Sequence, residues 1–351
     1  MTSPVSVRSC EAGRIVVQTR RAMRRFAPLL LAAATLANTC VHAGDAVEFN
    51  AWLSRIHDAS LHRAYTGTFV VSALGAPGMA SAHIWHVCDG SAQMERVDAL
   101  TGPSRTTYRR NEQVLTLYPQ SHAAIAETRD SLGLFPNLLK SDLADIASFY
   151  ALEHQGQQRI AGFDAEVVQL VPKDSWRYGY RIWNEKSSGL VMQVQTLDVN
   201  GQVLEQAAFS ELKLDAPVSV AQLSAQMADT RGYRIERRTL QKVDAQGLHW
   251  TVDKPPGGFH LMACYARPAH TPFAPPVQEG GPMQWMFSDG LANVSLFVED
   301  FNPQRHQHEG LTDMGGATHI FTRRSQDWWI TAVGEVPNAT LSAFAQALAR
   351  K

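Results

Sequence analysis

Several residue types and motifs are scarce or missing in this sequence, and each absence narrows the function. Cysteine occurs only four times in 351 residues and never as C-x-x-C, which argues against a disulfide framework or a cysteine-rich metal site. The formal net charge is −1, whereas nucleic-acid-binding proteins usually carry a basic surface. Phosphate-binding glycine signatures and a G-x-S-x-G motif are also missing. The sequence therefore gives no support to a nucleic-acid-binding protein, a nucleotide enzyme or a serine hydrolase.

The first 43 residues have the three parts of a secretory signal peptide. Four arginines within residues 20–25 precede an apolar run at residues 26–37, and Val41-His42-Ala43 provides small residues for cleavage. The run is shorter than the roughly 20 residues of a transmembrane helix. We expect export and cleavage near Ala43, with Met23 as an alternative start. A lipid-modified Cys40 and a twin-arginine signal are weaker alternatives.

The remainder, residues 44–351, carries 26 basic and 32 acidic side chains. Its two cysteines, Cys88 and Cys264, lie far apart in the chain. They form either one bridge between two domains or two buried thiols, and the sequence leaves both alternatives open.

Apolar periodicity predicts two β-rich units in the chain. Residues 46–62 form an amphipathic helix, and short alternating strands follow from residue 66 to residue 212, with a second helix from Ser141 or Asp142 to Phe149. This pattern predicts a first unit at residues 44–214 with a curved antiparallel sheet whose concave face is filled by the two helices. Residues 215–231 read as a linker with a short helix.

Residues 232–351 form the predicted second, smaller unit. Its first strand is expected at residues 234–243, and it ends in a helix capped by Asn338 or Thr340. Strands are expected at residues 283–288 and 292–299, so that Asp289-Gly290 is a hairpin turn and no catalytic acid. The histidines of the stretch His306-Gln307-His308-Glu309 have a spacing that does not suit a metal site.

Several segments, in the same order, resemble the RseB/MucB family of periplasmic regulators of an envelope-stress sigma factor. They are residues 65–71, 86–90, 95–96, 102–110, 250, 256–259, 287–291, 294–299 and 333–337. Cys88 and the loop at residues 267–282 depart from the usual pattern of that family.

The resemblance implies an α+β, mostly antiparallel β fold: an unclosed barrel like those of LolA and LolB, followed by a small C-terminal domain. It also implies a protein without catalytic residues, metal or cofactor that acts in the periplasm. Its partner would be the periplasmic region of an RseA/MucA-type anti-sigma factor, which it would shield from the site-1 protease until a lipid signal, lipopolysaccharide or lipoprotein acyl chains, displaces it. A lipid or lipoprotein carrier of the LolA/LolB type is the alternative function. The oligomeric state, monomer or homo-oligomer, is left open.

Two sets of site residues follow from these expectations. An acyl chain in the first unit would meet the apolar side chains of the two helices and the segment before the second: Trp52, Ile56, Leu138, Leu139, Ile146 and Phe149. The anti-sigma factor would contact the second unit at Phe297, Glu299, Arg323, Arg324 and Trp328.

Overall fold

The computed structural model describes residues 40–90, 92–128, 135–139, 145–238, 241–244, 250–266 and 283–350. Within it, Ala43–Lys351 is one compact unit. None of the helices in the described residues is long and apolar enough to span a membrane. The predicted signal peptide lies almost wholly outside the described residues.

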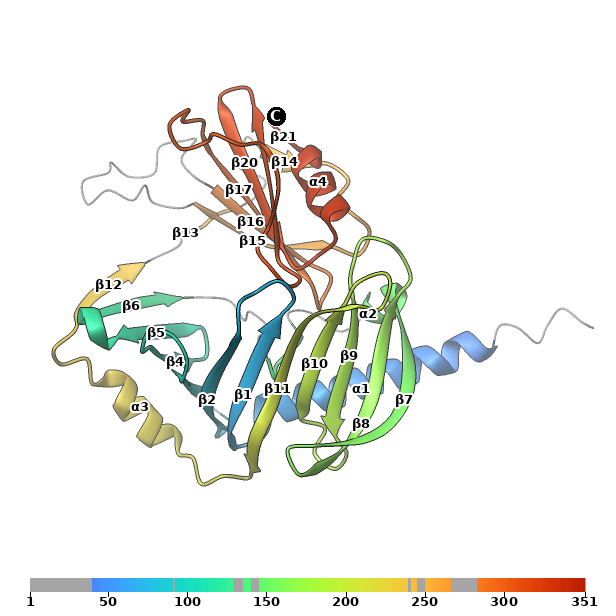
Figure 1. The fold of residues 1–351 in the computed structure, drawn as a ribbon, viewed down its shortest axis with the longest axis vertical. Coiled ribbons are helices and arrows are strands. Elements are labelled where there is room, and N and C mark those ends of the chain that lie inside the picture. Colours follow the sequence, from blue (N-terminus) through green and yellow to red (C-terminus); the bar gives the residue numbers. More distant parts are fainter. Residues whose placement is uncertain are drawn as a thin grey trace, which may run out of the picture. The chain divides into compact units, whose positions relative to one another are not determined.

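A twelve-stranded sheet accounts for most of the first half of the protein (Figure 1). Its strand order is β12-β6-β5-β4-β3-β2-β1-β11-β10-β9-β8-β7, and the neighbours are antiparallel except for the parallel pair β12 and β6. The order ends at β12 and β7, so the described strands form an open sheet. The strands are β1 (Tyr65–Ala73), β2 (Met79–Cys88), β3 (Gln93–Ala99), β4 (Thr106–Arg110), β5 (Gln113–Tyr118), β6 (Ala123–Thr128), β7 (Tyr150–Ile160), β8 (Phe163–Pro172), β9 (Gly179–Glu185), β10 (Val191–Leu197), β11 (Val203–Leu214) and β12 (Arg234–Arg238).

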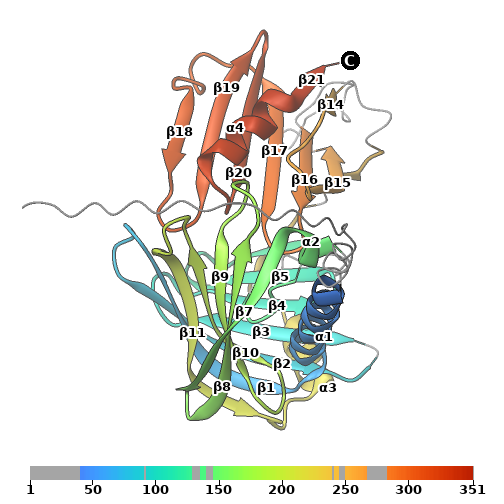
Figure 2. The ribbon, with the colours of Figure 1, turned by 90° about the vertical axis from the view of Figure 1, so that its right-hand side faces the viewer.

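A seven-stranded antiparallel sheet follows, in the order β13-β15-β16-β17-β20-β19-β18. A separate pair, β14 and β21, lies beside it. The strands are β13 (Gln241–Lys242), β14 (Trp250–Val252), β15 (His260–Ala266), β16 (Met283–Ser288), β17 (Asn293–Asp300), β18 (Gly310–Asp313), β19 (His319–Ser325), β20 (Trp328–Gly334) and β21 (Leu348–Arg350). Figure 2 shows α4 (Asn338–Ala347) lying across this sheet, where Phe344 and Leu341 are fully buried.

The helix α1 (Cys40–His62) packs on part of the concave face of the twelve-stranded sheet and runs behind β8, β9 and β10 in Figure 1. Its apolar residues recur at helical spacing, so Trp52, Leu53 and Ile56 face the sheet together. They pack against Ile182 and Val191 of the sheet. Burial of this apolar stripe fixes the helix, as the sequence predicts.

The other helices of the first half are short. The second predicted helix is the single turn α2 (Ile146–Phe149), which adds Ile146 to the same core; residues 140–144 lie outside the described residues. The helix α3 (Val220–Ala228) begins with Ser219 as its cap. It packs on the opposite, convex face of the sheet, where Leu223 contacts Met94. A 3-10 turn, η1 (Pro119–Ser121), joins β5 to β6.

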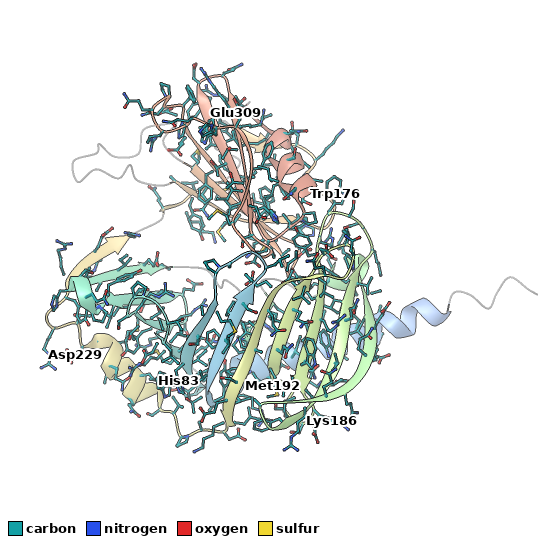
Figure 3. All side chains as sticks on the ribbon, viewed as in Figure 1. His83, Trp176, Lys186, Met192, Asp229 and Glu309 are labelled. Carbon is teal, nitrogen blue, oxygen red and sulfur yellow. The ribbon has the colours of Figure 1, made fainter. Side chains whose placement is uncertain are left out.

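Two local predictions about the second half are corrected. The strand expected at residues 234–243 is divided, because β12 pairs with β6 in the large sheet while β13 pairs with β15 in the small one. The helix expected to begin with Asn338 or Thr340 as its cap has Pro337 at that position. The Thr340 hydroxyl instead donates to the carbonyl of Trp176, 2.8 Å away in the β8–β9 loop, where Figure 3 labels Trp176. Tertiary contact has replaced the local cap.

Candidate functional site

The concave face of the twelve-stranded sheet holds a cavity of about 510 Å³. This volume lies within the range of about 300–1,000 Å³ that small-molecule sites usually have. Alternate residues of neighbouring strands point into it, since Phe69 pairs with Ala82, and Ala82 with Ala99. The lining residues are Phe69, Val71, Ala80, Ser81, Ala82, Ile84, Gln93, Glu95, Val97, Ala99, Thr101, Arg105, Thr107, Arg109, Val114, Phe135, Asn137, Glu205 and Ala207.

The cavity has an apolar stretch of lining with charged groups on both sides of it. Phe69, Ile84 and Val97 supply apolar surface from three adjacent strands. Charged groups flank this surface: Glu95 of β3 and Arg109 of β4 lie opposite each other in the strand register, and Glu205 of β11 lies on the other side. An amphiphile, with an apolar chain and a polar head, would find both kinds of contact in this lining.

Phe135 closes one wall of the cavity from the segment of residues 135–139. Its ring centroid lies 5.7 Å from that of Phe69 and 5.0 Å from that of Phe209. The ring also packs against the α1 core, so one side chain borders both the cavity and the core. Displacement of Phe135 would therefore disturb both.

The six residues predicted to contact lipid come together, but in the packed core instead of the cavity lining. Trp52, Ile56, Leu139 and Ile146 are at most 5 % exposed, and Leu138 and Phe149 pack against them. The Trp52 indole N–H donates to Asn184 Oδ1 at 3.2 Å, which fixes the ring against β9. Contact of these six residues with a ligand remains a prediction. Their sequence signal, apolar helical spacing, is the same for a helix that packs on a sheet as for one that lines a cavity.

A second assembly of polar groups surrounds Asp289, in the turn between β16 and β17. The turn is confirmed: Asp289 Oδ1 accepts the backbone N–H groups of Leu291 and Ala292 at 2.9 and 2.7 Å. Asp289 Oδ2 accepts from Arg177 Nη1 at 2.7 Å and from the Tyr150 hydroxyl at 3.1 Å. The carboxylate is thus one point where the small-sheet hairpin meets the large-sheet half of the protein.

Arg177 is fully buried, and each side of its guanidinium has a partner. Asp174 accepts from Nε and Nη2 at 2.9 and 3.0 Å, and the carbonyl of Gly257 accepts from Nη2. The guanidinium carbon lies 4.5 Å from the ring centroid of Phe149 and 5.2 Å from that of Phe259. A buried charge requires such full pairing, because an unpaired one is strongly destabilising.

Burial and the charge of Asp289 also shift the pKa values of its two partners, Tyr150 and Arg177. Burial, followed by the charge of Asp289, raises the pKa of Tyr150 well above its ordinary value. Burial acts to lower the pKa of Arg177, but the hydrogen bond to Asp174 and the charge of Asp289 outweigh it and raise the pKa. Tyr150 is therefore a neutral donor and Arg177 a fixed cation. The sequence offers no signal for this cluster, since its members lie in separate segments.

The five residues predicted to contact the partner divide between the two faces of the small sheet. Strand register places Phe297, Glu299 and Arg324 on one face, with Glu299 and Arg324 both opposite Trp329. Arg323 and Trp328 lie on the other face, toward α4.

Their contacts differ accordingly. Arg323 Nε donates to the carbonyl of Ala345 at 2.8 Å, at the end of α4. Trp328 meets Trp250 edge to face, with centroids 5.5 Å apart. Arg324 is exposed and stacks on Phe301, 3.8 Å from its centroid. The structure does not bring the five residues into one surface, and their role in partner binding remains a prediction.

The histidine stretch at residues 306–309 is a structured loop. His306 stacks on Trp329 with centroids 4.7 Å apart, and its Nδ1 accepts the N–H of Asn302 at 2.9 Å. Nowhere in the described part of the chain do three or more His, Cys, Asp or Glu side chains form a group that could hold a metal ion.

Comparison with known proteins shows which family has this architecture. The model of the MucB/RseB N-terminal domain matches residues 48–227, and that of the MucB/RseB C-terminal domain matches residues 244–349. The sigma factor AlgU regulatory protein MucB of Pseudomonas aeruginosa is 28 % identical over 329 residues, covering 92 % of this chain and 96 % of that protein. The sigma-E factor regulatory protein RseB of Escherichia coli K12 is 23 % identical over 296 residues, covering 84 % and 89 %.

A solved structure shows the same fold. The structure described as the complex of Pseudomonas aeruginosa MucA/MucB is 25 % identical and superposes with a TM-score of 0.65, covering 87 % of this chain and 99 % of that chain. The two domain models together match well over half of the sequence. The chain therefore belongs to the MucB/RseB family.

Proposed function

We propose that this protein binds the periplasmic region of a MucA/RseA-type anti-sigma factor and controls its cleavage by the site-1 protease. The observation that carries the proposal is the match of both family domains along the chain, together with a relative whose structure is a complex with MucA. The relatives are covered almost completely, so the similarity is not confined to one domain. The proposal includes no catalytic step, because the protein acts by binding its partner and shielding it from the protease.

The proposed location is the periplasm. Support comes from the signal-peptide pattern at residues 1–43 and from the solved complex of a relative with MucA(peri). The proposed domains keep the bounds expected from the sequence: residues 44–214 as the ligand-binding domain, 215–231 as the linker and 232–351 as the small domain. Within the described part of the last range, β12 is the one segment that pairs with the large sheet.

The proposed signal is a lipid with an apolar chain and a charged head. The cavity on the concave face supports this, because Phe69, Ile84 and Val97 offer apolar contact while Arg105 and Arg109 add cationic groups to its lining. A ligand that prefers the partner-free conformation must weaken partner binding by the ratio of its two affinities. Such coupling commonly amounts to about 5–150-fold.

A protease-protection assay tests the proposal. The chain from residue 44 onward is mixed with the periplasmic fragment of the anti-sigma factor and the site-1 protease, with and without lipopolysaccharide. We expect the fragment to be protected by the protein and cleaved again when lipopolysaccharide is added. Cleavage at the same rate with and without the protein would overturn the proposal. A heat-unfolded sample of the same chain serves as the control for non-specific protection.

A lipid or lipoprotein carrier is the second candidate, and the cavity is the observation that favours it. A carrier would move a labelled lipid from donor to acceptor vesicles, whereas a regulator would bind it without speeding transfer. A carrier would need only the twelve-stranded sheet, which holds the cavity. The presence of the additional seven-stranded sheet therefore favours the regulator.

A further inference from the structure

The cavity and the Arg177 cluster are connected by packed side chains. Phe135 lines the cavity and packs against the core that contains Leu139, Ile146 and Tyr150. Leu291, in the turn that Asp289 closes, belongs to this same core. The apolar neighbours of the cavity thus continue into the hairpin of the small sheet.

The cation of Arg177 rests on that core. Phe149, which packs against it, supports the guanidinium face at 4.5 Å. At its edge, the guanidinium donates from Nη1 to Asp289 Oδ2 in a hydrogen bond of 2.7 Å. A shift of Phe149 would therefore alter the position of Arg177, which ties the turn to the large sheet by a buried ion pair.

We propose that Arg177 is the positioning residue that transmits occupancy of the cavity to the small sheet. An occupant displaces Phe135, the core around Phe149 repacks, and Arg177 loosens its hold on Asp289. This inference rests on the proposed function, for which it supplies a route from the ligand to the small sheet, where the predicted partner contacts lie.

The physical reason is that both parts of the route resist gradual change. Close-packed side chains have little free space, so a displaced ring forces its neighbours into another arrangement. A buried ion pair is directional and loses most of its value once the two groups separate. Together they favour two discrete states over a continuous adjustment.

The test fills the cavity covalently, so that it does not depend on the identity of the natural lipid. Ala82→Cys, in the chain from residue 44 onward carrying Cys88→Ser, is modified with a dodecyl thiosulfonate, and a methyl thiosulfonate provides the empty-cavity control. Ala82 lines the cavity and Cys264 is buried. Hydrogen exchange measured by mass spectrometry reports on the amides of residues 288–292, two of which are bonded to Asp289.

We expect the dodecyl chain to speed exchange in residues 288–292 by about 5–150-fold relative to the methyl control. In the double variant Arg177→Met with Asp289→Asn, exchange should be fast with either modification and differ by less than about twofold between them. The asparagine keeps the oxygen that accepts from the turn amides, so the hairpin itself can still form. Arg55→Met with Glu166→Gln, which breaks an ion pair between α1 and β8, should retain the full response.

Two results would overturn the inference: no effect of the dodecyl chain in the parent, or an equal effect in the Arg177 double variant. Neither result would bear on whether the protein shields its partner, because that is read separately in the protease-protection assay. Conversely, if the anti-sigma fragment were not protected from the protease, the exchange experiment would still show whether filling the cavity loosens the turn at residues 288–292.

Discussion

Gly258 lies directly against the ring of Phe149. A Cβ atom placed on Gly258 would be 2.6 Å from Phe149 Cε2, and the residue has a φ of +85°. The loop before β15 therefore approaches α2 as closely as a backbone without a side chain allows. This contact lies beside the Arg177 cluster, since the carbonyl of Gly257 accepts from Arg177.

The first prediction concerns Gly258→Ala. A positive φ by itself makes alanine unfavourable by about 1–2 kcal/mol. The clash with Phe149 should add about 1–3 kcal/mol to that loss. Gly232→Ala is the matched control, because Gly232 has a φ of +82° and nothing within 4 Å of the added Cβ. Urea unfolding of both variants measures the difference, and equal losses would show that the Phe149 contact is unimportant.

The second prediction concerns acid stability. His86 is fully buried; its Nδ1 donates to the carbonyl of Arg63 at 2.7 Å, and its Nε2 accepts from Gln93 at 3.0 Å. Burial lowers the pKa of His86, against the smaller opposing effect of Glu95. Above pH 6.5, the usual pKa of histidine, the ring is neutral in both the folded and the unfolded protein, and its full contribution to stability is present. As the pH falls through the lowered pKa of the folded state, that contribution is lost, because the unfolded protein takes up the proton more readily.

The free energy of unfolding should consequently fall between pH 7 and pH 5. The fall should be smaller in His86→Gln, which cannot be protonated there. His122→Gln, at an exposed position, should behave like the parent. An unchanged pH dependence in His86→Gln would contradict the prediction.

The third prediction concerns the cavity. Val97→Trp places a large ring among the lining residues and should weaken binding of a lipopolysaccharide probe by about tenfold or more, which equals about 1.4 kcal/mol. Val199→Trp adds the same ring at a turn position that is 74 % exposed and should leave binding unaltered. Circular dichroism confirms folding of both variants. Undiminished binding to Val97→Trp would remove this cavity as the lipid site.

The fourth prediction separates two adjacent arginines. Arg323→Glu should lower the free energy of unfolding by about 1–3 kcal/mol, because the side chain bonds to carbonyls at the end of α4. Arg324→Glu should leave stability nearly unchanged, since Arg324 is exposed. Contact of the partner with the sheet face that carries Arg324 predicts that Arg324→Glu weakens binding of the anti-sigma fragment by about fivefold. Calorimetry and titration measure both, with the highly exposed Arg231→Glu as the control. An unaffected dissociation constant in Arg324→Glu would remove this face from the interface.

Much of the local structure follows from the sequence alone. Apolar spacing in residues 46–62 requires a helix with one buried stripe, and alternation in residues 292–299 requires a strand with one buried face. The Asp289-Gly290 turn is equally local, because its side-chain and backbone groups bond to residues two and three positions ahead. These features depend on periodicity and turn chemistry, which neighbouring residues specify among themselves.

Other features depend on where distant segments meet, and the tertiary structure alone decided them. The same apolar helical stripe can line a cavity or pack against a sheet, and the curvature of the sheet placed the cavity at Phe69 and Val97 instead of at Trp52 and Ile56. Asp289 reads as an ordinary turn acid until folding brings Arg177 within 2.7 Å. Its second carboxylate oxygen had no partner within its own hairpin, and a buried charge must find one elsewhere in the fold.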